Sequence, residues 1–390
     1  MGYCRGYVSG FGPGRGAGAL NVAFRTDASV EAGTGHVMRC LTLANTLSQQ
    51  GASCHFLCRE HPGHLADKVR DADHRVTLLD SPTTAFALSD ASRHALWLGA
   101  TMEMDAAQSI DALGDEPVDW LVVDQYGIDL QWETMVRPYA KRIMVIDDLA
   151  DRRHDCDVLL DQNLGRHEGH YKALCAPDTR LLLGPQFALL RPEFTEWREW
   201  ALTNRSTSRQ ILVSLGGTDW SNATAKVLQE INEVPLSKEW SILVVLGPSC
   251  PHIEQIRVMV RTMNVETKLL VGANNMAELM ASCAFSVGAS GSTSWERCCL
   301  GLPTLMLVTA ENQRAIADTL VAAKAAQMFS REAFVALSDT GPSGRALRFE
   351  MGRRAATLCD GSGAQRARDA MTASCDELGA RVDPALNTER

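Results

Sequence analysis

The sequence contains no apolar run approaching the ~20 residues that a helix needs to cross a bilayer. Residues 1–20 also lack the apolar stretch of a secretory signal peptide. These absences predict a cytoplasmic protein that does not contact the membrane. Basic residues are also scarce, with 38 Lys and Arg against 47 Asp and Glu, and the net charge of -9 disfavours nucleic acid as a partner, because its phosphates are bound by clustered Lys and Arg.

Two motifs of phosphate and metal chemistry are missing as well. The chain has no G-x4-G-K-[ST] pattern, which disfavours ATP hydrolysis, and no evident paired-carboxylate motif, so we expect neither a metal nor a cofactor. Cys54, His55, Cys58, His61 and His64 are the one cluster with metal-ligating side chains, but a strand through this segment would point neighbours to opposite faces. We expect the twelve cysteines to be free thiols that pack as small hydrophobic groups.

What is present indicates an ordinary globular protein of two domains. The chain has 390 residues, of which 45% are hydrophobic and 22% charged, and this length suits two α/β domains at roughly 150 residues each. Two domains predict a cleft between them. We expect a monomer.

Short apolar runs alternate with helical patterns from Asn21 onward. The runs in the first half are 21–26, 53–58, 74–79, 120–124, 142–148 and 157–161, with helical patterns at 36–51, from 64, and at 130–139. Uninterrupted apolar runs of this kind predict a parallel sheet. We assign 1–20 to a flexible Gly-rich extension and 21–205 to a first Rossmann-like domain. Residues 162–204 do not continue the alternation of strands and helices, so we interpret them as a bridge to the second domain.

The second half restarts the same pattern. Its apolar runs are 210–217, 240–247, 267–272, 284–288 and 304–308, with helical patterns between them. We therefore assign 206–372 to a second Rossmann-like domain and 373–390 to a polar tail. Several runs end in glycine, and the Gly216-Gly217 pair is a candidate ligand contact, because open α/β sheets bind ligands beyond the carboxyl ends of their strands.

A glycine turn stands between the first strand and the first helix. Its sequence is Gly33-Thr34-Gly35-His36, and a tight turn at a helix start presents backbone N–H groups to an anion. His36 would lie in the first helical turn and face the cleft, where a neutral imidazole can act as a base. An N-capping turn with an exposed histidine explains the same spacing.

A second small-residue turn runs from Gly288 to Glu296. The backbone N–H groups of Ser290, Gly291 and Ser292 could hold a diphosphate, and Glu296 could accept hydrogen bonds from ribose hydroxyls. A purely structural tight turn is the alternative.

Other acidic residues are open to two interpretations. Asp147, Asp148 and Asp151 follow a strand and could bind sugar hydroxyls, but caps and solvated loop carboxylates are commoner there, so we leave them outside the catalytic set. Asp27 could orient His36 or form an Asx turn. Cys298 and Cys299 are assigned to packing rather than to nucleophilic chemistry.

Several long motifs occur in an order that resembles one family. They are RTDASVEAGTGHVMRCLTLA, VVDQYGID, VIDDLADRRHDCDVLLDQN, LLLGPQFALLRPEF, ILVSLGGTD, GASGSTSWERCCLGLP and ENQ, between about Asn21 and Ala323. The chain resembles the PseG family, the UDP-2,4-diacetamido-2,4,6-trideoxy-β-L-altropyranose hydrolases of pseudaminic acid biosynthesis, whose GT-B fold is similar to that of the MurG glycosyltransferase. The resemblance implies two doubly wound Rossmann-like domains with an interdomain cleft.

The resemblance also implies roles for individual residues. His36 matches the histidine proposed as the base that activates water. The other matches are Tyr126 and Asn312 on the sugar, Glu296 on the ribose, Ser290 to Ser292 on the diphosphate, Val271 and Met276 around the uracil, and Gln313 on the sugar or phosphate. The family's usual Asp-His-Tyr is here Asp124-Gln125-Tyr126, which leaves the role of the replaced histidine in doubt.

The predicted function is therefore metal-independent hydrolysis of a UDP-linked diacetamido trideoxyhexose to the free sugar and UDP. A MurG-like glycosyltransferase would use the same UDP pocket, but we see no exposed apolar helix in the first half for a lipid acceptor. A binding module without turnover is the other alternative, and it would need no base at the sugar end.

Overall fold

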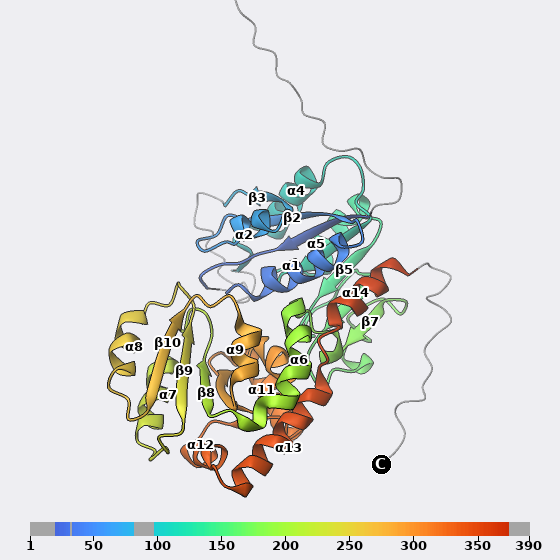
Figure 1. Cartoon of the computed structure of the whole chain (residues 1–390). Helices are drawn as coiled ribbons and strands as arrows, with labels where there is room; N and C mark the ends of the chain where they lie inside the picture. Colours follow the sequence, from blue (N-terminus) through green and yellow to red (C-terminus); the bar gives the residue numbers. More distant parts are fainter. Residues whose placement is uncertain (1–19, 32, 82–96, 374–390) are drawn as a thin grey trace, which may run out of the picture.

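The computed structural model describes residues 20–31, 33–81 and 97–373, which form two lobes (Figure 1). The predicted Gly-rich extension and polar tail fall outside these residues, apart from Leu20 and Ala373. None of the helices in the described ranges is long and apolar enough to cross a membrane.

The first lobe contains a seven-stranded sheet in the order β3-β2-β1-β4-β5-β6-β7, and neighbouring strands in it run parallel. Its strands are β1 (Asn21–Thr26), β2 (Ser53–Arg59), β3 (Arg75–Leu79), β4 (Trp120–Asp124), β5 (Ile143–Ile146), β6 (Val158–Asp161) and β7 (Arg180–Leu183). Its helices are α1 (Gly35–Ser48), α2 (Ala66–Asp71), α4 (Met102–Leu113) and α5 (Leu130–Val136), with 3-10 turns η1 (Arg137–Tyr139), η2 (Glu168–His170) and η3 (Pro185–Phe187). The strand order reverses between β1 and β4.

The second lobe contains a six-stranded parallel sheet in the order β10-β9-β8-β11-β12-β13. Its strands are β8 (Gln210–Ser214), β9 (Ser241–Leu246), β10 (Glu266–Val271), β11 (Phe285–Ala289), β12 (Thr304–Leu307) and β13 (Gln327–Met328). The helices of this half are α6 (Pro192–Asn204), α7 (Ala223–Asn232), α8 (Ile253–Val260), α9 (Met276–Ser282), α10 (Thr293–Cys299), α11 (Arg314–Ala322), α12 (Arg331–Ser338), α13 (Pro342–Leu358) and α14 (Gly363–Thr372), with 3-10 turns η4 (Arg205–Thr207) and η5 (Glu311–Gln313). The predicted pair of doubly wound sheets is confirmed.

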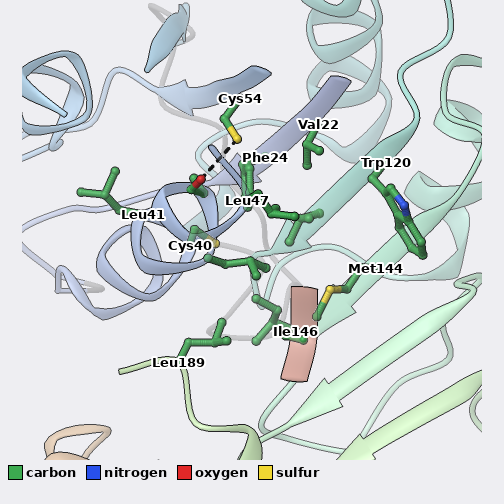
Figure 2. Packing of buried hydrophobic residues seen from close by; sticks show 14 of the residues in the cluster. Val22, Phe24, Cys40, Leu41, Leu47, Cys54, Trp120, Met144, Ile146 and Leu189 are labelled. Carbon is green, nitrogen blue, oxygen red and sulfur yellow. Dashed lines mark hydrogen bonds between the residues drawn. The ribbon is translucent and has the colours of Figure 1, made fainter. Parts of the chain in front are cut away.

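The first core forms because the apolar strands are covered on both faces. Figure 2 shows Cys40 and Leu47 of α1 lying against Val22 and Phe24 of β1, and Phe24 is fully buried. Burial on both faces of a parallel sheet explains why these strands read as continuous apolar runs.

Two helices pack in a lobe other than the one that their position in the chain suggests. α6 precedes β8 but packs in the second lobe, where its Phe194 is buried. α14 ends the described chain and returns to the first lobe beside α1 (Figure 1), where Ala367 is buried and Trp120 Nε1 donates to Met371 O at 3.1 Å. The boundary near residue 206 stays a proposal, and α14 packs with the first sheet although the sequence placed it in the second domain.

Helix α4 was not predicted from the sequence. Its fully buried positions are Asp105, Ala106 and Ser109, and Met102, Ile110 and Leu113 are partly buried against the same core, so polar and apolar side chains share the inner face of this helix. Asp105 accepts hydrogen bonds from Arg25 and Arg59, which compensates the buried charge.

Candidate active site at the junction of the lobes

The turn that carries His36 joins β1 to α1. Gly33 has φ +82, a left-handed conformation that glycine adopts without strain, and its N–H and C=O both pair with Ser29. Thr34 precedes the helix without capping it through its side chain. His36 therefore lies in the first turn of α1, and its side chain is 13% exposed.

Asp124 holds the imidazole of His36. The carboxylate ends β4, the strand next to β1, and its Oδ1 lies 2.6 Å from His36 Nδ1. Asp124 is fully buried, which alone would raise its pKa, but Arg39 and His36 hold that pKa well below the usual range. An ionised carboxylate on Nδ1 favours the tautomer in which Nε2 is free to accept a proton.

Arg39 ties two carboxylates together one turn further along α1. Its Nε and Nη2 donate to the two oxygens of Asp124 at 2.6 and 2.7 Å, and its Nη1 donates to Asp148 Oδ2 at 2.6 Å. Such a two-point guanidinium contact fixes orientation as well as charge. Arg39 therefore sets the position of the carboxylate that holds His36.

Tyr126 completes this cluster. Its ring meets the His36 ring edge-on, with centroids 4.6 Å apart, and its hydroxyl donates to Asp148 Oδ2 at 2.8 Å. Burial and the charge of Asp148 raise the pKa of Tyr126 well above its usual value, so the phenol remains protonated at neutral pH. Tyr126 can orient a ligand but does not supply a base.

Gln125 points away from His36. Its Nε2 donates to Asp27 Oδ2 at 2.7 Å, its Oε1 accepts from the Gly127 N–H, and the side chain is buried. Asp27 itself binds Arg25 at 2.6 Å, so it belongs to the buried ionic cluster below the site and does not orient the imidazole. The histidine that the resemblance implies at position 125 would occupy that buried layer.

The second turn lies across from the first. A Cβ added to Gly35 would lie 3.7 Å from Ser292 Oγ, and one added to Gly291 would lie 3.8 Å from Gln313 Nε2. Ser290 is buried, and its N–H and hydroxyl both donate to Leu307 O. The Ser290 amide is therefore committed to the fold, whereas within the described residues the amides of Gly291 and Ser292 donate to no protein group.

Glu296 lies one turn into α10 with its side chain 18% exposed. Burial raises the pKa of this carboxyl to about 7, and the Arg191 guanidinium 3.9 Å away offsets part of that increase. Glu296 is therefore poised to change charge near neutral pH.

The remaining predicted residues lie in the second lobe. Gly216 (φ +111) and Gly217 are exposed after β8, Val271 is 38% exposed at the end of β10, Met276 begins α9, and Asn312 is exposed in η5. The assignment of these residues to a ligand stays a prediction.

A cavity of about 530 Å³ lies elsewhere, beside Trp120 and Met371 at the amino end of β4. Ligands of doubly wound sheets bind at the opposite, carboxyl edge, where the strand order reverses. The His36 cluster occupies that reversal between β1 and β4, so we place the candidate site there and not at the cavity.

Sequence reasoning missed Asp124, Arg39 and Asp148 as members of this cluster. A usable signal existed, because both aspartates stand at the carboxyl ends of strands and Arg39 follows His36 by one helical turn. Only the strand order shows that β4 and β5 bring both carboxylates beside α1.

No model of a known protein family matches the chain. Among curated proteins, the chain is 28% identical over 262 residues to the UDP-2,4-diacetamido-2,4,6-trideoxy-beta-L-altropyranose hydrolase of Campylobacter jejuni, covering 67% of this chain and 81% of that protein. It is 34% identical over 142 residues to the spore coat polysaccharide biosynthesis protein SpsG of Bacillus subtilis, covering 36% of this chain and 41% of SpsG. An uncharacterised protein of Methanocaldococcus jannaschii is 26% identical over 306 residues, 77% of this chain and 58% of its own length.

Solved structures agree on the architecture. MurG of Acinetobacter baumannii matches with a TM-score of 0.63 at 15% identity, covering 90% of this chain and 99% of MurG. The calicheamicin glycosyltransferase CalG4 matches with a TM-score of 0.61 at 15% identity, covering 94% of this chain and all of CalG4. The GT-B fold and the resemblance to the PseG hydrolases are both confirmed.

Proposed function

We propose that the chain hydrolyses a UDP-linked 2,4-diacetamido-2,4,6-trideoxyhexose to the free sugar and UDP, in the biosynthesis of pseudaminic acid or a related nonulosonate. The observation that carries the proposal is the His36–Asp124 pair at the strand reversal, opposite the turn of Gly291 and Ser292. The curated hydrolase supplies the substrate class, and SpsG supports a place in polysaccharide biosynthesis.

In this proposal His36 acts as the general base. Its Nε2 takes a proton from water while the water oxygen attacks the anomeric carbon, and the bond from that carbon to the UDP oxygen breaks. Asp124 accepts the Nδ1–H and pairs with the imidazolium that forms. UDP leaves with the bonding electrons, and no step needs a metal ion.

Other residues would bind the two ends of the substrate. Tyr126 and Asn312 would face the sugar, and the amides of Gly291 and Ser292 would hold the diphosphate. Glu296 would accept from the ribose hydroxyls, while Val271 and Met276 would flank the uracil. Preorganised N–H donors at a developing anion can lower a barrier by roughly 3 kcal/mol each, which favours departure of UDP.

The test is UDP release from the UDP-linked sugar in EDTA with no acceptor added. We expect His36→Ala to abolish release, and Asp124→Asn to lower kcat by about 10²- to 10⁴-fold, because the wrong imidazole tautomer is then stabilised. His167→Ala, which removes an exposed histidine on the loop after β6, is the matched control and should behave as the unmodified chain. Release that survives in His36→Ala contradicts the proposal.

A glycosyltransferase is the second candidate, because MurG and CalG4 share the fold. It would use the same UDP site but pass the sugar to a hydroxyl acceptor. UDP release that appears only when an acceptor is supplied supports this alternative. Tight binding of the UDP-sugar without release under either condition supports a binding module.

A further inference from the structure

Arg297 lies directly beneath the turn that would hold the diphosphate. It is only 3% exposed, and its Nη2 donates to Ala289 O at 2.6 Å and to Ser294 Oγ at 3.0 Å, on either side of the turn. The guanidinium also occupies the space over Gly288, where an added Cβ would overlap Nη1. The turn is therefore built around this side chain.

The charge of Arg297 has no carboxylate partner in the described part of the chain. Buried arginines of the first lobe differ, since Arg25, Arg39 and Arg59 each form ion pairs with aspartates at 2.6 Å. Arg297 Nε is also buried without a hydrogen-bond partner, as is Arg205 Nε, so what distinguishes Arg297 is that it donates on both sides of the turn. An unpaired buried charge is costly, so a site that keeps one is suited to an anion.

Burial lowers the pKa of Arg297 to about 10, and the group is still charged at neutral pH. The nearest acid along the helix, Glu296, lies within the same site and has its own pKa raised to about 7. The cation beneath the turn is thus only weakly compensated by the protein itself.

We infer that Arg297 is a positioning residue for the leaving group, and that its cation stabilises a nucleoside diphosphate held by Gly291 and Ser292. This inference rests on the proposed function, because it assumes that the turn binds a diphosphate. The charge acts through the buried layer below the turn, where low dielectric strengthens its attraction for an anion. This attraction adds to the hydrogen bonds that the backbone N–H groups of the turn would donate to the diphosphate.

Arg205 serves as the control for a purely structural role of Arg297. Arg205 is also a half-buried cation of the second lobe, and it has no carboxylate partner among the described residues. Burial lowers the pKa of Arg205 to about 10. Its guanidinium donates to Met280 O, Cys283 O and Leu300 O, away from the turn. Arg205→Gln therefore removes a similar cation without touching the diphosphate site.

The experiment compares binding of UDP and of uridine by calorimetry with the full chain, well above pH 7, because Arg297 also lowers the pKa of Glu296 and its loss would otherwise affect both ligands. We expect Arg297→Gln to weaken UDP by at least about tenfold, the loss of one charge-assisted interaction, and to change uridine by less than about twofold. Arg297→Lys should recover part of the UDP affinity. Arg205→Gln should leave the ratio of the two affinities unchanged.

Gly288→Ala is an independent test of the same inference. The added Cβ would displace the Arg297 guanidinium, while the charge of Arg297 remains in the chain. It should weaken UDP more than uridine, and it decides the matter if Arg297→Gln does not fold. Equal losses for UDP and uridine, or no loss, would overturn the inference. An unmodified chain that binds no UDP would instead refute the proposed function.

Discussion

At the scale of single residues, the site combines a histidine with charges that are already paired. Asp124 receives donors from His36 and from two nitrogens of Arg39, and Asp148 receives Arg39 and Tyr126. The donors on Asp124 hold its pKa well below the usual range and fix the orientation of its carboxylate. In the proposed reaction the imidazole of His36 is therefore the group that exchanges a proton with water.

Glu296 gives a pH dependence that can be measured. Its pKa is raised from 4.5 to about 7 by burial, so the fold favours the protonated acid. The stability from this group is complete below about pH 4.5 and is lost as pH rises through 7. In the proposed role of Glu296, ribose hydroxyls would donate to the ionised form, so we expect UDP affinity to rise between pH 6 and 8, with proton release on binding.

Glu296→Gln tests the predicted pH dependence of both the stability and the UDP affinity. It should raise the thermal stability at pH 8, weaken UDP, and remove the pH dependence of UDP affinity between pH 6 and 8. Glu254→Gln on the exposed face of α8 is the control and should change none of these. A pH profile that persists in Glu296→Gln would assign the titration to another group.

At the scale of elements, the residues of the site lie at the ends of strands and at the start of a helix. β1 and β4 are neighbours in register from Val22 with Trp120 to Thr26 with Asp124, so Asp124 emerges next to the turn that begins α1. β5 ends one strand further along and is followed by Asp148. Side chains distant in sequence thus converge because parallel strands end at one edge.

α14 makes the first lobe depend on the end of the described chain. Ala367 is fully buried against the core of the first sheet. Ala367→Asp would place an unpaired carboxylate there, and we expect a loss of about 3 kcal/mol in unfolding free energy. Gln365→Asp, on the exposed side of the same helix, should cost less than about 0.5 kcal/mol in denaturant unfolding. Equal effects would show that α14 does not stabilise the first lobe.

At the scale of the whole molecule, the lobes meet at a few points around the site. Trp220 Nε1 donates to Val30 O at 3.3 Å, and Gly35 faces Ser292 across the junction. These contacts join the turns that follow β1 in one lobe and β8 and β11 in the other. Substrate binding at the junction would therefore depend on the spacing between the lobes.

Gly35 tests that dependence. A Cβ at Gly35 would make only ordinary contact with Ser292 Oγ, so Gly35→Ala should be tolerated. Gly35→Leu extends into the junction, and we expect it to weaken binding of the UDP-sugar by at least about tenfold, at the scale of a few kcal/mol for overpacking, while the melting temperature changes little. Calorimetry and thermal unfolding measure the two effects. Unimpaired binding in Gly35→Leu would place the substrate away from this junction.

The sequence alone determined the two sheets, because a strand buried on both faces must be apolar throughout and such runs are visible without a structure. It also indicated both turns, since glycine between a strand and a helix is a local signal. It did not reveal α4, whose inner face mixes Asp105 and Ser109 with apolar side chains, or the return of α14 to the first lobe. Nor could it show that Asp124, Arg39 and Asp148 surround His36, because strand order, a long-range property of the folded chain, decides which carboxylates meet one helix.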